Sequence, residues 1–389
     1  MKNKLVIIFA LALAFVSCEN QEISFDDFPT SSVYFPFQTP ARTLIQGKYE
    51  LGFNDNDNKG RFEIGLVMSG VYENTVDRKI GFELAPEIID AALLGVDTVN
   101  VKVLPSSYYT IEQTSPVTIP AGSTKGRIPV QLNDAFFDDP LAFAGEDDVH
   151  YVIPLKITNF DDSLDSLLTG VPAVANPIRI RDEDWTDLPK DYTLYGIKFI
   201  NKYSGIHLRR GEDKVVGTSQ SIKTDANGVV IETGALTNYD EAIVYRSEYV
   251  VQDELTPITT IGRNKALSTN LVRRPSVIPS NKSVSLELTF NSNEEVTITN
   301  ADQNSNLTIT GTGNFVEDGD EWGGKSRNVI YLEYQYQEQE VEVSEERVFG
   351  RLVSTTTTTL NLTHTVKDTL VMRDRNIKFE EFTIDLQKK

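Results

Sequence analysis

The feature that most constrains the fold is a series of short segments in which apolar and polar residues alternate. Alternation with a period of two is typical of a β-strand that buries one face and exposes the other. In the first half of the chain these segments are separated by polar turn residues, and they include residues 32–35, 61–67, 78–84, 117–120, 126–132 and 151–157. Short strands at this spacing predict an immunoglobulin-like β-sandwich.

A charged stretch then separates this region from a second strand-rich region. Residues 181–190 combine several acidic residues with Trp185 and Pro189, a composition typical of a domain boundary. Beyond it, about ten further segments alternate like strands and are joined by polar turns, which indicates a barrel or a larger sandwich. The predicted fold is therefore all-β. An immunoglobulin-like β-sandwich is expected over residues 31–182, and a β-barrel or β-sandwich domain over residues 186–389.

The N-terminus has the pattern of a secretory leader. Lys2 and Lys4 precede an apolar run over residues 5–17, which is shorter than the roughly 20 residues of a membrane-spanning helix. The only cysteine of the chain, Cys18, follows directly in the sequence Phe15-Val16-Ser17-Cys18. This is similar to a bacterial lipoprotein box, with Phe where Leu is usual. We expect residues 1–17 to be a signal peptide and Cys18 to be lipidated; the alternative is an ordinary signal peptide with an incidental cysteine.

Residues 18–30 are polar and acidic after the cysteine and are predicted to be a flexible tether. The acidic residues just after Cys18 resemble the signal that exports Bacteroidota lipoproteins to the outer face of the outer membrane. The expected location is therefore the outer membrane, lipid-anchored and facing the cell exterior. The alternative is a solvated linker that carries no export signal.

Composition limits the partners. The chain has 37 basic and 57 acidic side chains, a net charge of −20, whereas a nucleic-acid-binding protein normally presents a basic surface. The same charge repels anionic membranes, so the lipid is the only membrane contact we expect. One cysteine and three histidines exclude an internal disulfide and argue against a zinc site. The acidic loops leave calcium as the one candidate cofactor, but residues 55–60 depart from an EF-hand at Lys59 and again at Leu66, and no metal site is predicted.

Catalytic motifs are missing from the sequence. It has no Gly-x-Ser-x-Gly elbow, no His-Glu-x-x-His motif and no phosphate-binding loop. A chitinase-like series of acidic residues begins at Asp162 and Asp165 but fails at Leu167. We therefore expect no catalytic residue and no enzyme activity. Because a glycosidase needs only two placed carboxylates, a surface glycoside hydrolase stays open as an alternative. A fimbria-like structural subunit held by strand exchange is the other alternative.

Aromatic and polar residues near turns are the candidates for binding a sugar, whose C–H faces stack on rings. Trp322 lies in a charged loop beside two glycines, while Tyr203, His207 and Arg209 follow one another near the start of the second region. We expect these four residues to bind a glycan. In the alternative interpretation, Trp322 covers one end of the barrel and the other three belong to a strand–turn–strand unit.

Several motifs together resemble one group of proteins. They are the lipoprotein box with its acidic tail, LPSSYY at residues 104–109 followed by IPAGS at 119–123, and LPKDYTLYGIKF at 188–199 followed by YSG at 203–205. They are similar to Bacteroidota surface lipoproteins encoded in polysaccharide-utilisation loci. The resemblance implies an N-terminal immunoglobulin-like domain, a β-rich C-terminal domain and a non-catalytic glycan-binding or accessory role in a Sus-like uptake system. The implied partners are a glycan and Sus-type transporter components.

Overall fold

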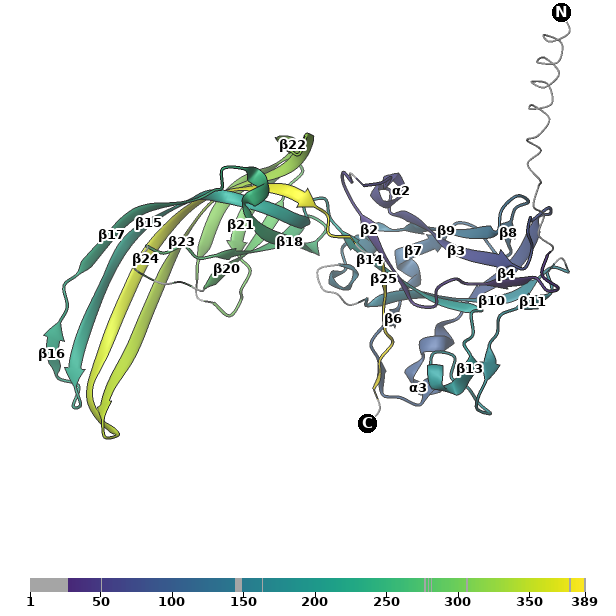
Figure 1. Cartoon of the computed structure of the whole chain (residues 1–389), viewed down its shortest axis with the longest axis horizontal. Helices are drawn as coiled ribbons and strands as arrows, with labels where there is room; N and C mark the ends of the chain where they lie inside the picture. The colour runs from purple at the N-terminus through teal and green to yellow at the C-terminus, as the bar shows by residue number, and fades with distance from the viewer. Residues whose placement is uncertain are drawn as a thin grey trace, which may run out of the picture.

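The computed structural model describes residues 27–49, 51–143, 149–162, 164–275, 278, 280, 282–305, 307–377 and 379–387. The predicted signal peptide, Cys18 and most of the predicted tether lie outside the described residues. Strands make up 57% of the chain and helices 8%, arranged in two sheet-rich domains (Figure 1). The prediction of an all-β fold, with a sandwich followed by a larger barrel-like domain, is confirmed. Within the described part of the chain, no helix combines the length and the apolar character needed to cross a bilayer.

Two facing sheets form the N-terminal domain. One sheet has the strand order β11-β1-β3-β9-β7, with bounds Ser166–Leu167, Ser32–Tyr34, Arg61–Ser69, Lys125–Leu132 and Tyr109–Ile111. The other has the order β25-β2-β14-β10-β4-β8, with bounds Glu380–Glu381, Pro40–Ile45, Tyr192–Ile200, Tyr151–Phe160, Arg78–Leu84 and Val117–Ile119. Strand β6 (Lys102–Val103) pairs with β10 at the side of this sheet.

The alternation in the sequence explains the sandwich core. In β3, Phe62, Ile64 and Leu66 are buried while the residues between them face outward. Burying such a row of apolar side chains against the opposite sheet provides the main driving force for folding. Short helices occupy the connections: α2 (Asp55–Asn58), α3 (Ala91–Leu94) and α4 (Asp134–Phe137). The acidic residues 55–60, which depart from an EF-hand, include α2. Its Asp57 is buried and accepts hydrogen bonds from Arg42 and from the amide of Ile45.

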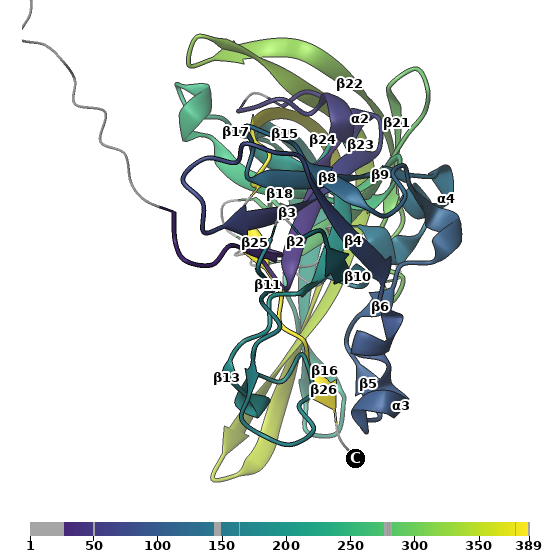
Figure 2. The same cartoon turned by 90° about the vertical axis from the view of Figure 1, so that its right-hand side faces the viewer.

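The sandwich also takes strands from beyond the expected boundary at residues 182–186. Strand β14 pairs with β10 in antiparallel and with β2 in parallel orientation, so residues 192–200 belong to the N-terminal sheet. The last residues return to the same domain. Strand β25 pairs with β2, and β26 (Leu386–Gln387) pairs with β5 (Thr98–Val99), beside α3 in Figure 2. We call residues 379–387 the C-terminal strap.

The C-terminal domain is a closed barrel. Its sheet contains ten strands, of which β16 and β17 lie off the ring. Every neighbour in the ring is antiparallel, and the pairing of β15 with β24 closes it, which removes the free edges of an open sheet. The ring strands are β15 (Gly205–Asp225), β18 (Glu254–Gly262), β19 (Lys265–Leu271), β20 (Ser283–Phe290), β21 (Glu295–Asn300), β22 (Ile309–Trp322), β23 (Lys325–Val348) and β24 (Arg351–Asp374).

Three ring strands extend far beyond the barrel. Strands β15, β23 and β24 continue outward, and β17 (Thr237–Tyr245) and β16 (Val230–Thr233) pair with the outer part of β15, forming the long curved sheet in Figure 1. We call this extension the β-arm. Close approach of β15 and β24 requires small residues, since a Cβ on Gly217 would lie 2.0 Å from the carbonyl oxygen of Asn361. Strand β22 stops pairing at Tyr336, so β23 continues into the β-arm with β24 as its only partner among the described strands.

Candidate functional site

The structure places Trp322 on the outside of the barrel, at the end of β22. Its ring packs against Leu208, Val329 and Val371, and its indole nitrogen donates to the carbonyl oxygen of Met372 at 3.4 Å. The guanidinium of Arg327 lies 4.4 Å from the ring centroid. The ring is therefore half-buried and has contacts on several sides.

Tyr203 lies at the base of the barrel, next to the sandwich. Its ring stacks on Phe290 at a centroid distance of 3.5 Å, and its hydroxyl donates to Glu294 at 3.1 Å. Burial, together with Glu294, raises the pKa of the Tyr203 hydroxyl. Tyr203 thus packs in the apolar core of the barrel rather than on an exposed surface.

His207 and Arg209 both point from β15 into the barrel. His207 is fully buried, and burial lowers its pKa to about 4, so the ring is neutral at pH 7. Its Nδ1 lies 3.2 Å from the carbonyl oxygen of Gly205. Of the four predicted glycan-binding residues, His207 and Arg209 share this interior, while Tyr203 lies nearer the base and Trp322 lies outside.

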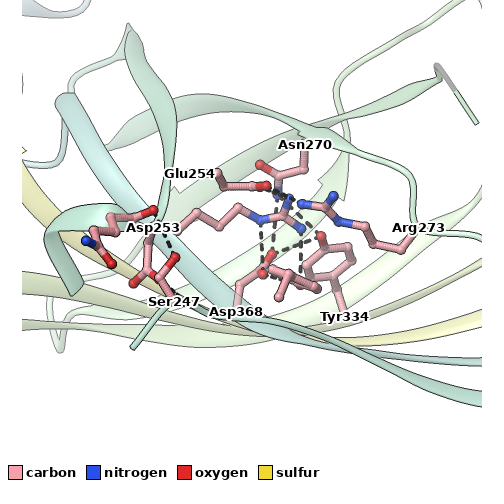
Figure 3. A network of polar contacts seen from close by, with 10 residues as sticks. Ser247, Asp253, Glu254, Asn270, Arg273, Tyr334 and Asp368 are labelled. Carbon is pink, nitrogen blue, oxygen red and sulfur yellow. Dashed lines mark hydrogen bonds and ion pairs between the residues drawn. The ribbon is translucent and has the colours of Figure 1, made fainter. Parts of the chain in front are cut away.

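Figure 3 shows a buried polar network that includes Glu254, Tyr334 and Asp368. The hydrogen bonds place Arg209 at its centre. Its Nε donates to Asp368 at 3.0 Å, one terminal nitrogen donates to Glu254 at 2.6 Å, and the other donates to the Tyr245 hydroxyl at 3.2 Å. Asp368 also accepts hydrogen bonds from Tyr245 and from Tyr334. Burial raises the pKa of Asp368, and the positive charge of Arg209 opposes that shift. These groups satisfy one another inside the barrel, which is the condition for burying charges there.

A second polar cluster lies closer to the β-arm, where the barrel opens. His364 stacks on Tyr336 at 4.3 Å, and its Nδ1 lies 2.8 Å from Asp213. Its Nε2 lies 3.6 Å from Glu338, which also forms an ion pair with Arg274. Burial raises the pKa of Glu338, but His364 and Arg274 lower it more strongly, to about 2. Glu338 is therefore a carboxylate at neutral pH.

The low pKa of Glu338 predicts that the free energy of unfolding decreases in acid. Glu338 has a pKa of about 2 in the folded chain, against an ordinary value of 4.5. Its contribution to stability is therefore complete above about pH 4.5 and lost as the pH falls toward 2. Glu338→Gln should flatten the decrease in unfolding free energy over that range, measured by urea denaturation at a series of pH values. Glu345→Gln, at an exposed ion pair with Arg347, is the control. Equal slopes for wild type and Glu338→Gln would contradict the assignment.

A pocket of about 790 Å³ opens beside this cluster. It lies where β22 begins opposite Tyr336 and β23 continues into the β-arm. The residues at the start of β20 and the loop between β21 and β22 form the opposite wall. We call it the mouth pocket. The side chains that line it are mostly amides and hydroxyls, including Gln335, Gln337, Gln339, Thr310, Thr363 and Ser283.

Side chains that could bind a metal ion do not form a cluster in the part of the chain that the structure describes. Among the residues that the structure describes, no group of three or more His, Cys, Asp or Glu side chains is arranged to hold a metal ion. Acidic side chains of the barrel interior instead contact arginines or, in the case of Asp213, His364. The expectation of no cofactor, with calcium as the one candidate, stays a prediction.

Two family models match the chain. A domain of unknown function (DUF5627) matches residues 202–376, which is the barrel with its β-arm, and a model described as an N-terminal domain matches residues 28–164 of the sandwich. No curated protein matches the chain. The fold and the pocket thus define a two-domain β-protein with a polar pocket at the mouth of its barrel.

Solved structures extend this comparison. A protein of unknown function from Bacteroides ovatus is 27% identical with a TM-score of 0.72, and the alignment covers 93% of this chain and 100% of that one. An auxiliary nutrient binding protein from Bacteroides thetaiotaomicron is 12% identical with a TM-score of 0.35, covering 87% of this chain and 95% of that one. A putative carbohydrate binding protein from Bacteroides ovatus is 11% identical with a TM-score of 0.26, covering 84% and 95%. The first shares the two-domain fold; the other two are too distant to define the site. The match to the first structure fits a protein of the Bacteroidota.

Proposed function

We propose that this chain is a lipid-anchored protein of the outer-membrane surface that binds a glycan in the mouth pocket without cleaving it, as an accessory component of a Sus-like uptake system. The observation that carries the proposal is the lining of the mouth pocket. Its amide and hydroxyl side chains offer both donors and acceptors, which suit the many hydroxyl groups of a neutral sugar. The pocket volume of about 790 Å³ lies within the ordinary range of ligand sites, roughly 300–1,000 Å³.

The electrostatics of the pocket support binding over hydrolysis. Glycoside hydrolysis ordinarily needs two carboxyl groups, one of them protonated to act as an acid. Glu338 is the only carboxyl group among the described residues that line the pocket, and its pKa of about 2 keeps it ionised. Its remaining role is to orient Arg274 and to accept hydrogen bonds. Incubating the protein with plant and host glycans and assaying for new reducing ends tests this; sustained release of reducing ends would contradict a binding-only role.

The anchor is tested separately. Mass spectrometry of the mature protein should find Cys18 as the first residue, carrying acyl chains, and Cys18→Ala should release the protein from the membrane fraction. A mature chain that begins elsewhere without fatty acid would contradict the proposed location but not the pocket.

The pocket itself is tested by removing its amides. Gln337 and Gln339 are exposed residues of β23, so truncating both should leave the fold intact. Each hydrogen bond contributes about 1 kcal/mol, so Gln337→Ala with Gln339→Ala should weaken binding of a neutral glycan by roughly 10- to 30-fold. Affinity electrophoresis in gels that contain neutral polysaccharides, followed by calorimetry, provides the measurement.

Gln252→Ala is a matched control, because this exposed glutamine does not line the pocket. It should migrate like wild type in every gel. If the double variant also kept wild-type affinity for a glycan that wild type retains, the mouth pocket would not be the binding site. Failure of the wild-type protein to bind any glycan would contradict the function as a whole.

A further inference from the structure

We infer that the N-terminal domain carries a second sugar-binding site, in a groove between the C-terminal strap and the segment at residues 179–189. The groove has a volume of about 700 Å³. Three distant parts of the sequence line it: residues 36–39 before β2, the 179–192 segment before and at the start of β14, and residues 381–386 of the strap. We call it the strap groove. It is separate from the mouth pocket, with which it shares no lining residue.

The strap is fixed in place, so the groove has firm walls. The amide of Phe382 donates to the carbonyl oxygen of Thr39 at 3.0 Å, and the side chain of Asn100 donates to Thr383 at 3.0 Å. Phe382 and Ile384 pack on an apolar cluster that includes Tyr192 and Leu194. A site whose walls are already ordered loses less conformational freedom when a ligand binds.

Exposed aromatic side chains lie at the edge of the groove. The ring of Phe37 is 43% exposed and the ring of Phe379 is 69% exposed, with their centroids 5.1 Å apart. Leu188, which also lines the groove, is 50% exposed. Exposed apolar side chains gathered at one groove mark an interaction site. Flat rings of this kind provide large, rigid surfaces on which the C–H face of a sugar stacks.

Arg181 provides an available hydrogen-bond donor beside these rings. Its guanidinium lies 3.7 Å from Glu183 and 3.8 Å from Asp184, which are ion-pair distances but longer than hydrogen bonds. Arg179 is different, because it binds Asp191 directly and lies over the Trp185 ring. Arg181 can therefore direct its planar donors toward a ligand in the groove, while the contacts of Arg179 with Asp191 and Trp185 stabilise the groove wall.

The charges of the lining select the class of ligand. Arg179 and Arg181 share the groove with the carboxylates Asp182, Glu183, Glu381 and Asp385. The excess of carboxylates disfavours uronic acids, sialic acids and sulfated sugars. Ring surfaces together with both donors and acceptors suit a neutral sugar, which has an apolar face and hydroxyl groups at its edge.

Trp185 provides a local signal for the experiment. It is one of two tryptophans in the chain, and its ring contacts Arg179 at the groove wall. In the full chain with Trp322→Phe, titration with neutral oligosaccharides and with oligogalacturonate should give a saturable change in Trp185 fluorescence with a neutral sugar only. Phe37→Ala and Arg181→Ala should each weaken that binding about tenfold. Phe53→Ala, which removes a fully exposed ring of the same domain, is the control.

Each outcome has a definite meaning. A Trp185 response that the Gln337 and Gln339 double variant keeps and Phe37→Ala loses supports the strap groove as a separate sugar site. No Trp185 response to any neutral sugar, or a response unaffected by both Phe37→Ala and Arg181→Ala, overturns it. A response to oligogalacturonate or to a basic peptide in place of neutral sugars also overturns it. To keep the two sites distinct, the affinity-gel test of the Gln337 and Gln339 double variant is also made in the Phe37→Ala background, in which the strap groove contributes less to retention.

Discussion

Replacing Arg209 with alanine should lower the free energy of unfolding of the barrel by about 3–5 kcal/mol, because it leaves Asp368 buried without its charge partner. The loss is measured by urea denaturation. Lys214→Ala is the control: it breaks an exposed ion pair with Asp240 and should cost no more than about 1 kcal/mol.

A double variant distinguishes the cause of that loss. Arg209→Met with Asp368→Leu removes both charges and leaves apolar side chains of similar size, so it should be closer to wild type than Arg209→Ala alone. If Arg209→Ala lowered the free energy of unfolding no more than Lys214→Ala does, Arg209 and Asp368 would not act as a buried charge pair.

The second large effect concerns the sandwich. Phe199 of β14 is fully buried, and its ring contacts Phe136, Phe137 and Phe143 at centroid distances of 5.9, 5.1 and 5.4 Å. Phe199→Ala should therefore cost about 3–5 kcal/mol of unfolding free energy, through lost burial and the cavity that remains. Phe53→Ala, at a fully exposed ring of the same domain, should be close to neutral. A small loss for Phe199→Ala would show that the surrounding rings close the cavity.

The sequence predicts the strands well because their signal is local. The alternating burial of Phe62, Ile64 and Leu66 can be read from a few consecutive residues. Which sheet a strand joins is not a local property. Residues 193–200 look like a strand of the second region, yet β14 pairs with β2 and β10 in the first domain. The strap is similar, since its partner strands lie near the other end of the sequence.

The candidate site also depends on contacts between residues that lie far apart in the sequence. Arg209 stands out in the sequence among polar neighbours, but its partner Asp368 is 159 residues away and is brought close only by the pairing of β15 with β24. Period-two alternation could have placed Tyr334, Tyr336 and Glu338 on one inward face of β23. It could not show that β22 begins only opposite Tyr336, which is what opens the mouth pocket. The exposed position of Phe37 next to Phe379 also depends on the return of the strap.

The strap also determines the order in which the molecule can be completed. Strand β2 leaves the ribosome long before its neighbour β25, because the two lie far apart in the sequence. The edge of the N-terminal sheet is therefore completed only after the barrel has been synthesised, and the first domain cannot finish folding before residues 380–381 are available. Nascent chains stalled before residue 379 should consequently be digested faster by protease across the first domain than full-length chains.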